Sequence, residues 1–166
     1  MVKLKYIVIV VLAIVVGIFA YNHFFQSEES KVKKRFDLLS KWGSKDSVEN
    51  KLITANRVNN IKTLFAENCN VQAPAYSVSR NYKPQDISSI ALMVLSQYIE
   101  LSLRFYDIQI NIPEKRLANA VLTAKLSGKL TSDEYVNEIH ELECVLIKIE
   151  DNWLFSEIKI VDVLEK

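Results

Sequence analysis

The pattern of apolar and polar residues divides the chain into a short uncharged run and a longer region of spaced apolar positions. The uncharged run extends from Tyr6 to Phe25, and every residue from Ile7 to Ala20 is apolar. A helix rises about 1.5 Å per residue, so this run would span about 30 Å, the hydrocarbon thickness of a bilayer. We therefore predict a transmembrane helix at residues 6–25, in contact with the lipid bilayer, after a short tail at residues 1–5.

A cleaved signal peptide is the alternative for this segment. Lys3 and Lys5 would form its basic start, and Ala20 would precede the cut. Ile18 stands where a small residue is preferred, which favours a retained anchor. The two lysines favour a cytoplasmic N-terminus and an extracytoplasmic domain, which would be periplasmic in a bacterium. The basic residues between 31 and 35 favour the opposite orientation.

Residues 27–166 show helical spacing first. A helix is predicted from Ser27 or Ser30 to about residue 42, and a second, whole or in two pieces, from Asp46 to about residue 68. Pro84 begins a third, of about 18 residues, which we interpret as a buried helix packed on a sheet. A short extended segment with Pro74 at an edge or bulge lies between the second and third helices.

The C-terminal half shows the alternation typical of strands. In "FYDIQINI" the three isoleucines share one face, and residues 117–130 alternate in the same way, with Ala118 and Leu122 on one face. "EIHELECVLIKI" and "WLFSEIKIVDVL" are joined by the short turn "EDN" and are partly apolar on both faces. This order predicts an α+β fold in which a curved antiparallel sheet wraps around N-terminal helices.

The two-faced apolar strands also predict a partner. We expect Phe155 and Val161 on one face of the last strand, and Leu154 and Ile158 on the other. If one face covers the helices, the other needs a second molecule, and we predict a homodimer through the sheet.

Composition restricts the classes of function. The net charge is +1, so nothing indicates nucleic-acid binding. His23 and His140 stand alone, and Cys69 and Cys144 lack metal-site spacing, so no metal or other cofactor is predicted. Phosphate-binding loops and nucleophile elbows are also missing from the sequence.

Three stretches carry a resemblance to a known superfamily: "LFAENCNVQAP" at residues 64–74, the helix after "NYKPQDI", and "IEDNWLFSEIKIV" with Trp153 after the turn. Together they resemble the nuclear-transport-factor-2-like superfamily, which includes SnoaL-like polyketide cyclases and ketosteroid isomerase. The resemblance covers roughly residues 30–166 and implies a cone-like domain at residues 27–166. It also implies that the last strand lies between those of Cys69 and Cys144, which places two free thiols beyond disulfide reach.

The resemblance argues against isomerase chemistry, which needs a carboxylate base, a phenol and an oxyanion donor. The position that matches the base is Ala73, preceded by Gln72, and the position that matches the phenol is Phe36. His140 is the remaining candidate base, and no acidic partner is predicted on its strand face. A solvated histidine at a strand end is the alternative.

We expect the mouth of the cone to gather a set of aromatic and basic side chains as candidate ligand-binding residues: Tyr76, Arg80, Tyr82, Tyr98, Arg104, Tyr106, His140 and Trp153. The predicted function is a membrane-anchored, non-enzymatic binding or assembly domain that docks a partner protein or a small apolar ligand at the membrane surface. It would be similar to the single-span assembly proteins of type IV secretion systems. The alternative is an isomerase, cyclase or hydrolase that uses the cone cavity.

Overall fold

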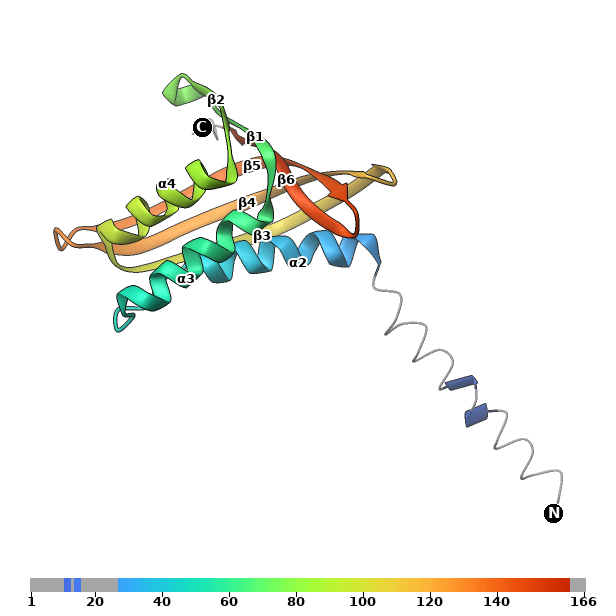
Figure 1. The fold of residues 1–166 in the computed structure, drawn as a ribbon, viewed down its shortest axis with the longest axis horizontal. Helices are drawn as coiled ribbons and strands as arrows, with labels where there is room; N and C mark the ends of the chain where they lie inside the picture. The colour runs from blue at the N-terminus through green and yellow to red at the C-terminus, as the bar shows by residue number, and fades with distance from the viewer. Residues whose placement is uncertain (1–10, 13, 16–26, 162–166) are drawn as a thin grey trace, which may run out of the picture.

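The structure is a computed structural model that describes residues 11–12, 14–15 and 27–161. Figure 1 shows its long strands running alongside the helices. The helices and strands are α2 (Glu28–Gly43), α3 (Lys51–Ile61), β1 (Phe65–Ala73), β2 (Val78–Tyr82), α4 (Pro84–Gln97), β3 (Tyr98–Glu114), β4 (Leu117–Leu130), β5 (Tyr135–Ile149) and β6 (Asn152–Val161), with short 3₁₀ turns at Lys62–Leu64 and Pro74–Tyr76. The strand order is β2-β1-β6-β5-β4-β3. The predicted α+β class is confirmed, but β1 pairs with β6 in parallel, so the sheet is not purely antiparallel.

The predicted anchor at residues 6–25 lies outside the described residues, apart from Val11, Leu12, Ile14 and Val15, and the tail at residues 1–5 lies wholly outside them. Within the described part of the chain, no helix combines the length and apolar character that a membrane span requires. The membrane segment therefore stays a prediction.

Helix α2 begins as the sequence predicts. The Ser27 hydroxyl accepts a hydrogen bond from the Ser30 amide at 3.2 Å, which satisfies one of the free amides of the first turn. Val32 and Phe36, four residues apart, are buried on the face that covers the sheet. The start of the helix is therefore explained by the capping hydrogen bond, and its orientation by the apolar stripe that it buries.

The other two helices depart from their predicted bounds. Helix α3 begins after Asn50, whose side-chain oxygen accepts from the Leu52 and Ile53 amides at 3.1 and 3.0 Å, and not at Asp46. Helix α4 has 14 residues, because Tyr98 already begins β3 and pairs with Leu130. Pairing with β4 competes successfully with helix propensity for this segment.

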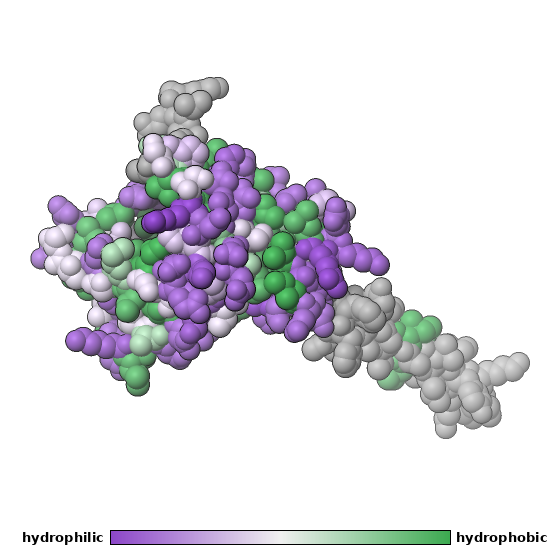
Figure 2. All heavy atoms as spheres, turned by 45° about the horizontal axis from the view of Figure 1, so that its top comes forward, coloured by the Kyte–Doolittle hydropathy of each residue, from purple (hydrophilic) through white to green (hydrophobic). Residues whose placement is uncertain are grey.

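Helix α4 is also less buried than predicted. Only Leu95 is fully buried, while Ile90, Leu92 and Met93 keep 40%, 48% and 55% of their surface exposed. Apolar side chains lie among polar ones on the face of the molecule shown in Figure 2. The helix therefore covers the sheet with one stripe and leaves apolar side chains in solvent.

The concave face of the sheet holds the core. Ala118, Ala120 and Leu122 of β4 point toward the helices, as the alternation predicts. The small alanines leave room for Phe36 and Phe155, whose ring centroids lie 5.1 Å apart in an edge-to-face contact. Large side chains thus fill the space under α2.

Two irregularities set which residues face this core. At Asp107 the backbone has a φ of 53° and the β3–β4 register shifts, so Phe105 and Ile108 both point inward. A second shift between β5 and β6 places both Phe155 and Ile158 inward. The predicted division of the last strand is therefore wrong, because the extra residue of the bulge reverses the alternation.

Candidate functional site

The concave face of β5 carries two groups capable of proton transfer. His140 lies opposite Ala124 in the register, on the same side as the buried Leu122 and Cys144. Glu138 stands two residues before it and shares that face. The His140 Nε2 atom lies 3.4 Å from Glu138 Oε2, with 32% and 57% of the two side chains exposed. The pair is thus half-open to solvent.

The expectation that His140 lacks an acidic partner on its strand face is wrong. Glu138, Ile139 and His140 follow one another in a strand, so the first and third side chains point the same way. The sequence could have predicted this pair, because residues two apart in a strand share a face.

This arrangement can hold and move a proton. A carboxylate only accepts hydrogen bonds, so the neutral imidazole that faces it carries its proton on Nε2 and leaves Nδ1 free to accept another. At 3.4 Å the contact is long, as catalytic hydrogen bonds often are before substrate binds. The pair therefore has the chemistry of an oriented general base.

The positions that match the isomerase residues carry no such chemistry. Ala73 ends β1 and is buried, and Phe36 lies within an aromatic cluster with Phe105 and Phe155. A methyl group and a phenyl ring exchange no proton, so these two positions contribute packing alone.

The predicted mouth residues do not gather around one cavity. Trp153 is 1% exposed, and its Nε1 donates to Glu28 at 2.8 Å. Tyr98 is buried against Val58 and Leu95. Arg104 and Tyr106 are exposed on the outer face of the sheet, opposite the helices.

Two of the remaining residues lie close together. Arg80 and Tyr82 on β2 line an open hollow of about 510 Å³ with Asp86 at the start of α4. Tyr76 belongs to the turn at Pro74–Tyr76, and its side chain is outside the described part. Among the described side chains of these eight residues, His140 combines an imidazole able to exchange a proton with a carboxylate beside it on the concave face.

A second charged cluster, which the sequence did not reveal, surrounds Glu28. Its carboxylate accepts hydrogen bonds from Trp153 at 2.8 Å and from Lys31 at 2.9 Å, and Lys148 lies 3.0 Å away. Burial alone would raise the pKa of this carboxyl, but the three donors together lower the pKa to about 2. The cluster joins α2 to the β5–β6 hairpin.

The two cysteines remain apart and unreactive. Cys69 on β1 and Cys144 on β5 are free and buried, and β6 lies between their strands. Burial raises the pKa of each thiol to about 12, so both stay protonated at neutral pH. Among the described residues, no three His, Cys, Asp or Glu side chains come together as a metal site would require.

No protein-family model matches the chain, and the search of curated proteins found no match. Solved structures do resemble it. A candidate scytalone dehydratase from Novosphingobium aromaticivorans is 16% identical, with a TM-score of 0.64 over 82% of this chain and 85% of that one. The hexachlorocyclohexane dehydrochlorinase LinA-type3 from Novosphingobium barchaimii is 7% identical, with a TM-score of 0.63 over 80% and 84%.

A third similar structure is named as an association domain. It is a candidate calcium/calmodulin-dependent protein kinase II association domain from Xanthomonas campestris, 14% identical, with a TM-score of 0.62 over 85% of this chain and 91% of that one. Identities this low speak to fold and leave function open. The chain therefore has the cone fold of the nuclear-transport-factor-2-like superfamily, as its sequence predicted.

Proposed function

We propose that the domain is an acid–base enzyme that removes a proton from carbon, in an elimination or an isomerisation. His140 would be the general base, and Glu138 would orient it. The observation that carries the proposal is the contact between these two side chains on the concave face of β5. It supports the enzymatic alternative over the non-enzymatic function first predicted from the sequence.

The names of the structural neighbours support the same class of reaction. A dehydratase removes water and a dehydrochlorinase removes hydrogen chloride. In either elimination a base takes a proton from one carbon while the leaving group departs from the next. A single oriented imidazole is sufficient for that step and contributes typically 10²–10⁴-fold in rate.

The surroundings of the pair favour an apolar substrate. Ala124 lies directly opposite His140 on β4, and Leu142 follows it on the same face of β5. When Nδ1 takes the substrate proton, the imidazolium that forms is stabilised by the Glu138 carboxylate. The chain itself thus supplies the base, the counter-charge and an apolar wall.

A turnover assay tests the proposal. The purified full-length chain is incubated with a series of small β-hydroxy and β-halo ketones, and product formation is followed by ultraviolet absorbance. We expect measurable turnover, a loss of at least about a hundredfold in His140→Ala, and a smaller loss with a shifted pH profile in Glu138→Gln. Glu141→Gln, on the exposed outer face beside His140, is the matched control and keeps wild-type activity. No turnover by the wild type, or equal turnover by His140→Ala, contradicts the proposal.

Non-enzymatic binding is the second candidate, and one observation favours it. The core beneath α2 is filled by large side chains, with Phe36, Trp153 and Phe155 each 1% exposed or less. A filled interior suits a domain that binds through its surface. Docking at a membrane surface rests on the predicted anchor alone and stays a prediction.

A further inference from the structure

The apolar core on the concave face of the sheet is divided into two clusters. One cluster includes Leu122 and extends toward the β5–β6 turn, and the other includes Tyr98 and Leu101 and lies near the β4–β5 turn. Among the described side chains, Ala124 of β4 is buried, with 9% of its surface exposed, but it belongs to neither cluster. The apolar packing is therefore interrupted at the position directly opposite His140.

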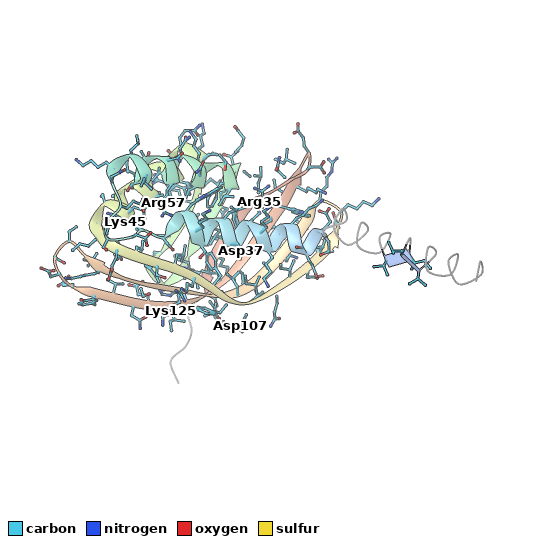
Figure 3. All side chains as sticks on the ribbon, turned by 90° about the horizontal axis from the view of Figure 1, so that it is seen from below. Arg35, Asp37, Lys45, Arg57, Asp107 and Lys125 are labelled. Carbon is cyan, nitrogen blue, oxygen red and sulfur yellow. The ribbon has the colours of Figure 1, made fainter. Side chains whose placement is uncertain are left out.

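Ala124 is the small member of a row that crosses three strands. Its register partners are Phe105 on β3 and His140 on β5. Figure 3 shows Lys125, the next residue of β4, on the side of the sheet away from α2, so the methyl group of Ala124 points toward the helices. Neighbouring strands lie about 4.8 Å apart, so Phe105 and His140 stand roughly 10 Å from each other with a single methyl group between them.

Larger apolar residues border this position along the strand. Leu122 and Leu126 stand two residues before and two residues after Ala124 on the same face of β4, about 13 Å from each other. A second alanine, Ala91 of α4, packs against both apolar clusters and so crosses the boundary between them. The position above Ala124 is thus bordered by apolar side chains and lies beside an imidazole that can exchange a proton.

We propose that Ala124 is a specificity-determining residue, on whose methyl group an apolar ring of the substrate lies between Phe105 and His140. The inference rests on the proposed function, because it places the substrate of that reaction. A six-membered ring buries more apolar surface in this position than an open chain does, and it loses less conformational freedom on binding. A larger side chain in place of the methyl group would occupy the space that the ring needs.

The ratio of kcat/KM for a cyclic and an open-chain substrate tests this assignment. The full-length chain is assayed with 3-hydroxycyclohexanone and 4-hydroxybutan-2-one, which both lose water to give an enone that absorbs ultraviolet light. We expect the wild type to favour the cyclic ketone and Ala124→Leu to lower the ratio by at least about tenfold. Ala124→Val should lower it less, and it provides the test if Ala124→Leu does not fold. Thr123→Leu, an enlargement on the opposite face of β4, is the matched control and should leave the ratio unchanged.

Binding is measured separately from turnover. Cyclohexanone, which has no leaving group, is titrated into the full-length chain while the imidazole signals of His140 are followed by nuclear magnetic resonance. His140→Ala identifies these signals. We expect saturable changes in the wild type and in Thr123→Leu, and binding that is at least about tenfold weaker in Ala124→Leu.

The two measurements separate this inference from the proposed function. Binding of cyclohexanone without any turnover, weakened in Ala124→Leu, would contradict the proposed function and support the place of the ring. Turnover that depends on His140, with the wild-type substrate ratio and cyclohexanone affinity kept in Ala124→Leu, would overturn the inference alone. An equal decrease in Thr123→Leu would also overturn it, as would a wild type that neither binds cyclohexanone nor acts on either ketone. Thermal unfolding verifies that each variant is folded.

Discussion

Single side chains tie the start of α2 to the hairpin of β5 and β6, which lie side by side in Figure 1. Glu28 bonds to Trp153 and contacts Lys148, and Arg35 donates to Asn152 at 2.8 Å. A buried indole N–H needs an acceptor, and here the acceptor comes from 125 residues away in the chain. Spacing along the sequence could reveal the Glu138–His140 pair, because it is local, but could not reveal this contact.

Replacing Glu28 by Gln should destabilise the domain in a pH-dependent way. The pKa of Glu28 is about 2 in the folded domain, below the usual value of 4.5 for a glutamate, so its stabilisation is complete above pH 4.5 and is lost as the pH falls toward 2. We expect a loss of about 1 kcal/mol at pH 7, because a partly exposed carboxylate is screened by solvent. Urea unfolding at pH 7 and at pH 2 measures it: the variant and wild type should differ at pH 7 and converge at pH 2.

Glu29→Gln is the matched control for this experiment. Glu29 is exposed in the same first turn of α2, and no hydrogen bond or ion pair of its side chain is found in the described part of the chain. Its replacement should leave the free energy of unfolding within about 0.5 kcal/mol of the wild type. An equal loss of stability in both variants would mean that Glu28 acts through its interaction with the helix dipole and not through the hydrogen bonds of the cluster.

At the scale of elements, regular alternation was predictable and its interruptions were not. The inward face of β4 follows directly from period-two spacing, as Ala118 and Leu122 show. The bulges at Asp107 and between Phe155 and Glu157 each insert one extra residue into a strand. The alternation of apolar and polar residues on either side of each bulge is equally consistent with an uninterrupted strand. Only the pairing of neighbouring strands determines where the extra residue goes.

Gly128 is required where β3 and β4 approach each other. A Cβ atom at this position would overlap the Glu100 carbonyl oxygen and would lie 3.1 Å from the Leu101 Cα. Backbone atoms cannot move aside without disturbing the ladder, so Gly128→Ala should cost about 1–3 kcal/mol. Thermal unfolding measures the loss.

Gly43 provides the comparison for this substitution. A Cβ there would meet the Leu103 Cδ2 atom at 2.9 Å, the end of a flexible side chain, and alanine favours the helix by about 0.5–1 kcal/mol. Gly43→Ala should therefore be close to neutral. If Gly128→Ala unfolded at the wild-type temperature, close strand approach would not be the reason for glycine at that position.

At the scale of the molecule, the order of helices and strands was sufficient to predict a curved sheet around helices, and the resemblance to a known superfamily implied the cone. The parallel pairing of β1 with β6 was not predictable, because it joins segments at opposite ends of the domain. The outer face of the resulting sheet is divided. Its β4–β5 turn end carries the register partners Ser102, Ser127 and Asn137, which are polar, and its β5–β6 turn end carries the register partners Leu117, Ile147 and Leu154, which are apolar.

This apolar row is where the predicted homodimer would form. The three side chains are half-buried on the face without helices, and a two-fold contact would cover them. We expect light scattering of the full-length chain at tens of micromolar to give twice the monomer mass of 19.1 kDa. Ile147→Arg should give the monomer mass, because a charge placed in an apolar contact is strongly unfavourable. Ile139→Arg, on the same face of β5 but nearer the β4–β5 turn, is the matched control and should leave the dimer intact. A wild-type chain that is monomeric, or a dimer that survives Ile147→Arg, would show that this face does not hold two copies together.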